Sequence, residues 1–154
     1  MSTIIESVDV DVPVSTSYDQ WTQFESFPMF MEGVEEVEQL DDTTLRWKAK
    51  IAGQERTWKA RITEQIPDER VAWTSIDGAR NAGVVTFHRL ADNQTRVTLQ
   101  LDVDPDGALD NIGDALGFVE RRAKGDLKRF KEFIETRGVE TGAWRGTVSQ
   151  HDNR

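Results

Sequence analysis

Two polar side chains in predicted strands could do chemistry inside this protein. If the strand over residues 55–66 alternates regularly, Glu64 shares a face with the apolar residues Ala60 and Ile62. Ser75 falls on the matching face of the next strand. A carboxylate in an apolar pocket has a raised pKa, which suits general acid or base catalysis. The alternative is that Glu64 lies at the wetter end of its strand and pairs with a cation, without a catalytic role.

Other catalytic and metal-binding residue sets are missing from the sequence. Cysteine is absent, which excludes thiol catalysis, thiolate metal sites and disulfides. His88 and His151 fall in an outward strand position and in a polar tail, so they cannot assemble a triad or a multi-histidine metal site. We therefore predict no metal and no cofactor, and Glu64 and Ser75 remain weak candidates for catalysis.

Charge and hydropathy restrict the partners of the 154-residue chain. Its net charge of −9 works against sequence-independent binding to nucleic acid or to an anionic membrane. A basic run from Arg121 to Lys131 is the exception; it reads as a solvated helix face or as a protein-interaction surface. No stretch approaches the ~20 apolar residues of a membrane span, and no export signal is visible. We expect a cytoplasmic protein that binds neither nucleic acid nor membrane, of unknown oligomeric state.

The order of predicted elements defines the fold class. A first strand around residues 8–12 precedes a short helical insert, and six further strands are expected at 34–40, 45–51, 55–66, 71–76, 83–90 and 96–103. Apolar residues then recur every three or four positions from Leu109 to Ile134, which predicts one long helix with an apolar stripe. Only a broad, curved sheet could cover that stripe. We predict an α+β fold in one domain, residues 1–138, followed by a polar tail, residues 139–154.

Strand alternation places large aromatic side chains on the face that meets the helix. Trp47, Trp58 and Trp73 share the inward face of the sheet. They either fill an ordinary core or form the wall of a ligand cavity. The residues expected to line such a cavity are Phe27, Phe30, Met31, Trp47, Trp58, Ala60, Ile62, Trp73, Val85, Phe87, Leu99, Ile112, Leu116 and Val119.

The helical insert between the first two strands could control access to such a cavity. Phe27, Phe30 and Met31 form an apolar cluster in it. Pro28 prevents a regular helix there, and Gly33 ends the segment. The insert is either a mobile gate over the long helix or a static hydrophobic plug.

Local motifs resemble those of a known family. Residues 46–49 (Arg-Trp-Lys-Ala) and 57–61 (Thr-Trp-Lys-Ala-Arg) resemble the paired-tryptophan hairpin of bacterial polyketide cyclase/dehydrase-like proteins, as do residues 27–31 and 63–73. On this resemblance the chain is identified as a member of the SRPBCC, START-like superfamily. The resemblance implies a helix-grip fold: a seven-stranded antiparallel sheet wraps a long C-terminal helix, with two short helices between strands 1 and 2.

The resemblance also implies a hydrophobic small molecule as the partner. We expect a binder of a lipid, a quinone or a polyketide-like aromatic in a cavity between sheet and helix. Cyclases of this fold use polar cavity residues, including arginine, to fold a polyketone; here Lys59 and Arg61 are expected to face solvent. A polyketide cyclase or dehydratase, and a protein-interaction module using the basic helix or residues 142–148, remain alternatives because a fold alone does not choose a function.

Overall fold

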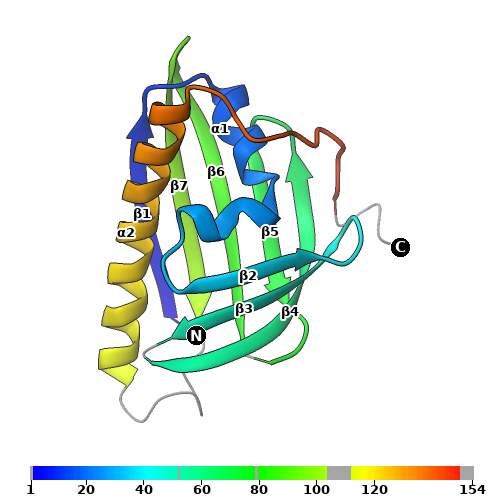
Figure 1. Cartoon of the computed structure of the whole chain (residues 1–154), viewed down its shortest axis with the longest axis vertical. Helices are drawn as coiled ribbons and strands as arrows, with labels where there is room; N and C mark the ends of the chain where they lie inside the picture. The colour runs from blue at the N-terminus through cyan, green and yellow to red at the C-terminus, as the bar shows by residue number, and fades with distance from the viewer. Residues whose placement is uncertain (1, 52, 79, 104–111, 150–154) are drawn as a thin grey trace.

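The protein is a curved antiparallel sheet closed on one side by a long helix (Figure 1). The computed structural model describes residues 2–51, 53–78, 80–103 and 112–149, with side chains except those of residues 2, 51 and 112–116. The strands are β1 Ser2–Val10, β2 Val34–Gln39, β3 Thr44–Ile51, β4 Gln54–Ile66, β5 Arg70–Ser75, β6 Asn81–Ala91 and β7 Gln94–Val103. The helices are α1 Val14–Trp21, the 3₁₀-helix η1 Phe24–Met29, and α2 Ile112–Arg137.

The strand order is β1-β7-β6-β5-β4-β3-β2, and every neighbouring pair is antiparallel. The two short helices lie between β1 and β2, and α2 runs alongside the edge strand β1 (Figure 1). This arrangement confirms the predicted helix-grip fold. The first strand begins earlier than predicted and ends at Val10, because Val12 already belongs to the turn that leads through Pro13 into α1.

The long helix is held by a stripe of apolar side chains with the predicted spacing. Ala123, Leu127, Phe130 and Ile134 are all buried, and their steps of three and four residues place them on one face. The helix ends where Gly138, with a φ of +75°, donates its N–H to the Ile134 carbonyl at 2.8 Å. The predicted beginning of the helix, residues 109–111, lies outside the described residues.

The insert packs tightly against the second half of α2. The ring centroids of Phe30 and Phe130 are 5.3 Å apart, and those of Trp21 and Phe130 are also 5.3 Å apart. Phe27 lies 5.3 Å from Trp21 by the same measure. These rings are buried, so the C-terminal half of the groove between sheet and helix is filled by aromatic side chains.

A β-bulge in β4 overturns one prediction. The pairing with β5 shifts between Ile62 and Glu64, and an extra residue on one strand reverses the inward and outward alternation beyond it. Gln65 is therefore the buried side chain, and Glu64 faces outward with an oxygen 3.6 Å from Arg70. The prediction that Glu64 points inward is wrong, whereas the alternative that it pairs with a cation is confirmed.

The segment after α2 is attached to the domain as far as Val148. Beyond Arg61 the edge of β4 is no longer paired with β3, and the Gln65 and Val148 backbones instead exchange hydrogen bonds of 2.8 and 2.9 Å. Arg145 contacts the carboxylates of Asp19 at 2.6 Å and Asp68 at 2.9 Å. The predicted polar tail therefore contains an apolar anchor, the buried Val148, and a cation held by two acids.

Arg145→Ala should destabilise the fold by about 1–3 kcal/mol, because it leaves a buried carboxylate without its cation. The Asp19 side chain is only 7% exposed, although Arg145 itself is 41% exposed. The control is Arg89→Ala, whose partner Asp92 is 86% exposed; this change should cost less than about 0.5 kcal/mol. Urea unfolding of both variants measures the difference, and equal losses would contradict a structural role for the C-terminal segment.

Candidate ligand pocket

A cavity of about 190 Å³ lies between the sheet and the first half of α2. One water molecule needs roughly 10–15 Å³ by this measure, so the space far exceeds a packing defect. Its apolar walls are formed by Trp21, Phe27, Met31, Val34, Trp47, Ala49, Trp58, Trp73, Leu99, Leu101, Val103, Phe118, Val119 and Ala123. Its polar and charged members are Glu32, Lys50, Asn81, Arg122 and Asp126, together with Gly33.

Three tryptophans line the cavity from neighbouring strands, as their alternation predicted. Trp47 and Trp58 are directly opposite each other in β3 and β4, and their rings stack with centroids 5.8 Å apart and an interplanar angle of 4°. Trp73 lies across from Gly83 in β6. A Cβ atom at Gly83 would come within 2.5 Å of the Trp73 ring, so the glycine allows the indole to lie flat over the neighbouring strand.

The predicted lining residues divide into two groups. Phe27, Met31, Trp47, Trp58, Trp73, Leu99 and Val119 line the cavity. Phe30, Ala60, Ile62, Val85 and Phe87 are buried but do not line it. Phe87, for example, packs edge-on against Tyr18 of α1 with centroids 5.5 Å apart. Strand alternation predicts which face a side chain takes but not how far along the strand the cavity extends. The side chains of Ile112 and Leu116 lie outside the described part of the chain.

Neither predicted catalytic candidate reaches the cavity. Glu64 is turned outward by the bulge in β4. Ser75 is half-buried, and its hydroxyl oxygen accepts the Asn81 backbone N–H at 3.0 Å. Ser75 thus connects the ends of β5 and β6 and does not line the cavity.

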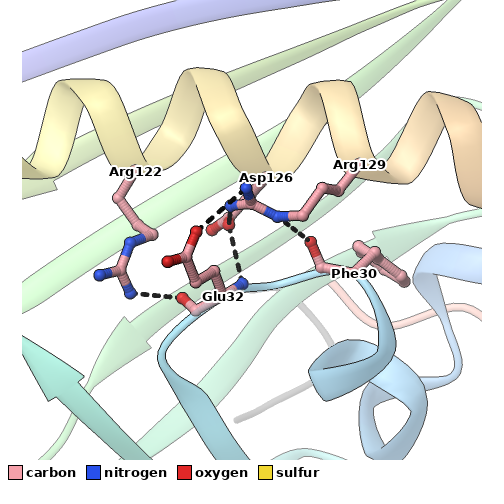
Figure 2. A network of polar contacts seen from close by, with 5 residues as sticks. All are labelled: Phe30, Glu32, Arg122, Asp126 and Arg129. Atoms are coloured by element: carbon pink, nitrogen blue, oxygen red, sulfur yellow. Dashed lines mark hydrogen bonds and ion pairs between the residues drawn. The ribbon is translucent and has the colours of Figure 1, made fainter.

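The charged end of the cavity was missed by the sequence reasoning. Residues 30–33 after η1 meet α2 there, through the polar network of Figure 2. Asp126 accepts the Glu32 backbone N–H at 3.1 Å and also bonds to Arg129. Arg129 donates to the Phe30 carbonyl at 3.2 Å and lies 3.1 Å from the Glu32 carboxylate. Arg122 donates to the Glu32 carbonyl.

A signal for this network exists in the sequence. Arg122, Asp126 and Arg129 recur at steps of four and three residues beside the apolar stripe of α2. An acid between two arginines at that spacing lies on the shoulder of the buried face, where it can meet a neighbouring element. The basic run from Arg121 to Lys131 was interpreted as one exposed face of the helix, so the inward position of Asp126 was not predicted.

Burial changes the chemistry of Asp126. Desolvation raises the pKa of this carboxyl to about 6, although the hydrogen bonds from Arg129 and Glu32 and the charge of Arg122 act in the opposite direction. The carboxyl therefore changes charge near neutral pH while lining an apolar cavity. Among the described residues, no group of three or more acids and histidines is placed to hold a metal ion.

The fold is the helix-grip fold, and solved structures share it. A START superfamily protein from Mycobacterium smegmatis is similar with a TM-score of 0.70 and 16% identity, over 88% of this chain and 95% of that one. The Zhui aromatase/cyclase from Streptomyces sp. R1128 is similar with a TM-score of 0.75 and 18% identity, over 93% and 99%. At such low identity these two structures show the fold alone.

Residues 10–132 match the family described as polyketide cyclase / dehydrase and lipid transport, and the chain belongs to that family. A relative from Streptomyces lincolnensis is 59% identical over 149 residues, which cover 96% of this chain and 99% of the relative. It is named an uncharacterized 17.2 kDa protein in the melC2-rnhH intergenic region. Within the described residues, none of the helices is both long and apolar enough to cross a membrane.

The raised pKa of Asp126 predicts a specific pH dependence of stability. The folded protein holds a proton on this carboxyl up to about pH 6, whereas the ordinary pKa of an aspartate, expected in the unfolded chain, is 3.8. Protonation therefore favours folding, and this contribution is lost as the pH rises through 6. The wild type should therefore lose about 1–2 kcal/mol of unfolding free energy through this group when the pH rises from 4.5 to 7.5. Asp126→Asn should not show that loss, because an amide does not titrate.

Urea unfolding at the two pH values measures this change. The exposed residue Asp42 supplies the control, and Asp42→Asn should follow the wild-type pH dependence. If Asp126→Asn also follows it, Asp126 is not a buried group that titrates near pH 6.

Proposed function

We propose that this protein binds a small, mainly apolar molecule in the cavity between the sheet and α2. The observation that carries the proposal is the cavity itself, about 190 Å³ of space walled by Trp47, Trp58 and Trp73. Membership of a family described by polyketide chemistry and lipid transport supports it. The candidate ligand classes are a lipid, a quinone and a polyketide-like aromatic.

Packing energetics support a binding role for the cavity. Protein interiors are packed as densely as organic crystals, and an unfilled cavity lowers stability in proportion to its volume. The second half of α2 shows that this chain can fill the same groove with aromatic rings. An apolar ligand would replace the missing contacts in the first half and remove its own surface from water.

The shape of the walls favours a planar body. The stacked indoles of Trp47 and Trp58 present flat, rigid surfaces, and aromatic partners gain about 0.5–1.5 kcal/mol beyond area burial in such contacts. Trp73 adds a third indole from β5. A fused-ring compound therefore suits the cavity better than a branched aliphatic one of the same volume.

A cyclase or dehydratase is the second candidate, favoured by Asp126. Ring closure with dehydration needs a group that takes and returns a proton near neutral pH. Asp126 lines the cavity, and its pKa is raised to about 6 by burial. The structurally similar Zhui protein is an aromatase/cyclase by name.

Binding should be visible in tryptophan emission. Titration with 1,4-naphthoquinone, a neutral planar quencher, should quench the emission saturably, and the chain has no cysteine to form an adduct with it. Trp58→Ala should weaken the affinity about tenfold, because one stacked wall of the cavity is lost. Trp144→Ala is the control, since Trp144 is partly buried outside this cavity. Linear, non-saturating quenching, or equal effects of the two substitutions, would contradict the proposal.

The enzymatic alternative predicts a separation between two carboxylates. If a polyketone substrate is turned over, Asp126→Asn should reduce turnover about a hundredfold or more, which is the low end for loss of general acid–base catalysis. Glu64→Gln should leave turnover within about twofold, because Glu64 pairs with Arg70 outside the cavity. Single-turnover assays with both variants test this. Loss of activity in Glu64→Gln would show that the reaction occurs outside this cavity.

A further inference from the structure

The charged residues of the cavity are concentrated at one end. Glu32 lies in the segment after η1, and Arg122 and Asp126 reach toward that segment from α2 (Figure 2). The other lining residues are indole, phenyl and aliphatic, apart from Lys50 and Asn81. A ligand that fills this space therefore meets apolar surface along its body and charge at one end.

The two arginines at this end have different partners. Arg129 contacts both acids, the Glu32 carboxylate at 3.1 Å and Asp126. Arg122 contacts only electrically neutral groups, namely the backbone carbonyl of Glu32 and the face of the Phe118 ring at 4.8 Å. Within the described part of the chain, no carboxylate oxygen lies within the 4.0 Å of an ion pair with Arg122. Arg122 and Lys50 are the two cations that line the cavity. Arg122 is the half-buried one and is bonded to the insert, whereas Lys50 is exposed.

We propose that Arg122 binds the carboxylate of an amphipathic ligand whose apolar body occupies the cavity. This inference rests on the proposed binding function and specifies the ligand as an organic anion. A guanidinium carries five N–H donors in a planar fork that matches a carboxylate. The hydrogen bond to the Glu32 carbonyl uses one of its terminal nitrogens, so donors remain for a ligand. Apolar walls strengthen such a charge-assisted contact relative to bulk water.

The backbone of the insert is shaped around this guanidinium. Gly33 has a φ of +85°, and a Cβ atom there would lie 1.7 Å from a terminal nitrogen of Arg122. Any larger residue would displace the arginine side chain from its place beside Gly33. Gly33 also accepts the Lys50 N–H at 2.7 Å, so β3 holds the segment on its other side. Arg122 of α2 is therefore positioned by the segment after η1, which β3 in turn holds in place.

The neighbouring acids do not prevent anion binding. Arg129 contacts both acids, and Lys50 is a further cation that lines the cavity. The residues that line the cavity or contact its acids therefore include three cations, Lys50, Arg122 and Arg129, and two acids, Glu32 and Asp126, in a chain with a net charge of −9.

Calorimetric titration with matched probes tests the inference. 2-Naphthoate and methyl 2-naphthoate share one ring system, as decanoate and decanol share one chain, and each pair differs in charge. At pH 7.5 the wild type should bind at least one anion about tenfold more tightly than its neutral counterpart, as expected for a charge-assisted hydrogen bond. The pair that shows the preference identifies a planar or a flexible body.

Three substitutions assign the preference to one side chain. Arg122→Gln should remove it, and Arg122→Lys should keep part of it because a charge remains. Arg121→Gln is the matched control, since Arg121 is the adjacent, exposed residue on α2 and does not line the cavity. It should retain the full preference. Retention in Arg122→Gln, or loss in Arg121→Gln, would overturn the assignment.

The experiment separates this inference from the function on which it rests. If the neutral probes bind and neither anion is preferred, the role of Arg122 is wrong while the binding function stands. If no probe binds, the binding function itself fails. Should Arg122→Gln fail to fold, salt titration of the wild type decides: anion affinity should fall with added NaCl while that of the neutral probe stays constant. Equal salt responses would overturn the inference.

Discussion

The contact between the apolar stripe of α2 and the concave face of the sheet is the interaction on which the rest of the structure depends. The helix contributes Ala123, Leu127, Phe130 and Ile134 to the core. Without them the inward faces of seven strands would be exposed to water, and burial of such surface is the main favourable term in folding. Because α2 is nearly straight and the sheet is strongly curved (Figure 1), their separation cannot be constant along the helix.

The chain resolves this mismatch differently at the two ends of the helix. Toward its C-terminus, Trp21, Phe27 and Phe30 of the insert fill the gap by packing around Phe130. Toward its N-terminus the facing side chains are large but flat, and the indoles of Trp47 and Trp58 stack on each other instead of crossing the gap. Cavity and core are thus consequences of the same geometry, and the insert marks the boundary between them.

The sequence was sufficient for the fold but not for the whole site. Strand alternation placed Trp47, Trp58 and Trp73 correctly because it depends only on local backbone geometry. It failed at Glu64, where a bulge that leaves no clear mark in the sequence reversed the faces. Arg122 and Asp126 were missed for another reason. The spacing within the helix places them beside the buried face, but their partners come from a segment about 90 residues earlier in the chain, which that spacing does not identify.

The network between the insert and α2 links access to the cavity with its chemistry. Residues 30–33 are attached to the helix by backbone groups at Phe30 and Glu32 that bond to side chains of α2. Two of these side chains, Arg122 and Asp126, also line the cavity. A ligand anion that engaged the remaining donors of Arg122 would leave the bond to the Glu32 carbonyl in place, so one guanidinium would contact both the ligand and the insert. Any change in the attachment of the insert that moves Arg122 would then change the affinity for the anion, and by linkage the bound anion would change the stability of that attachment equally.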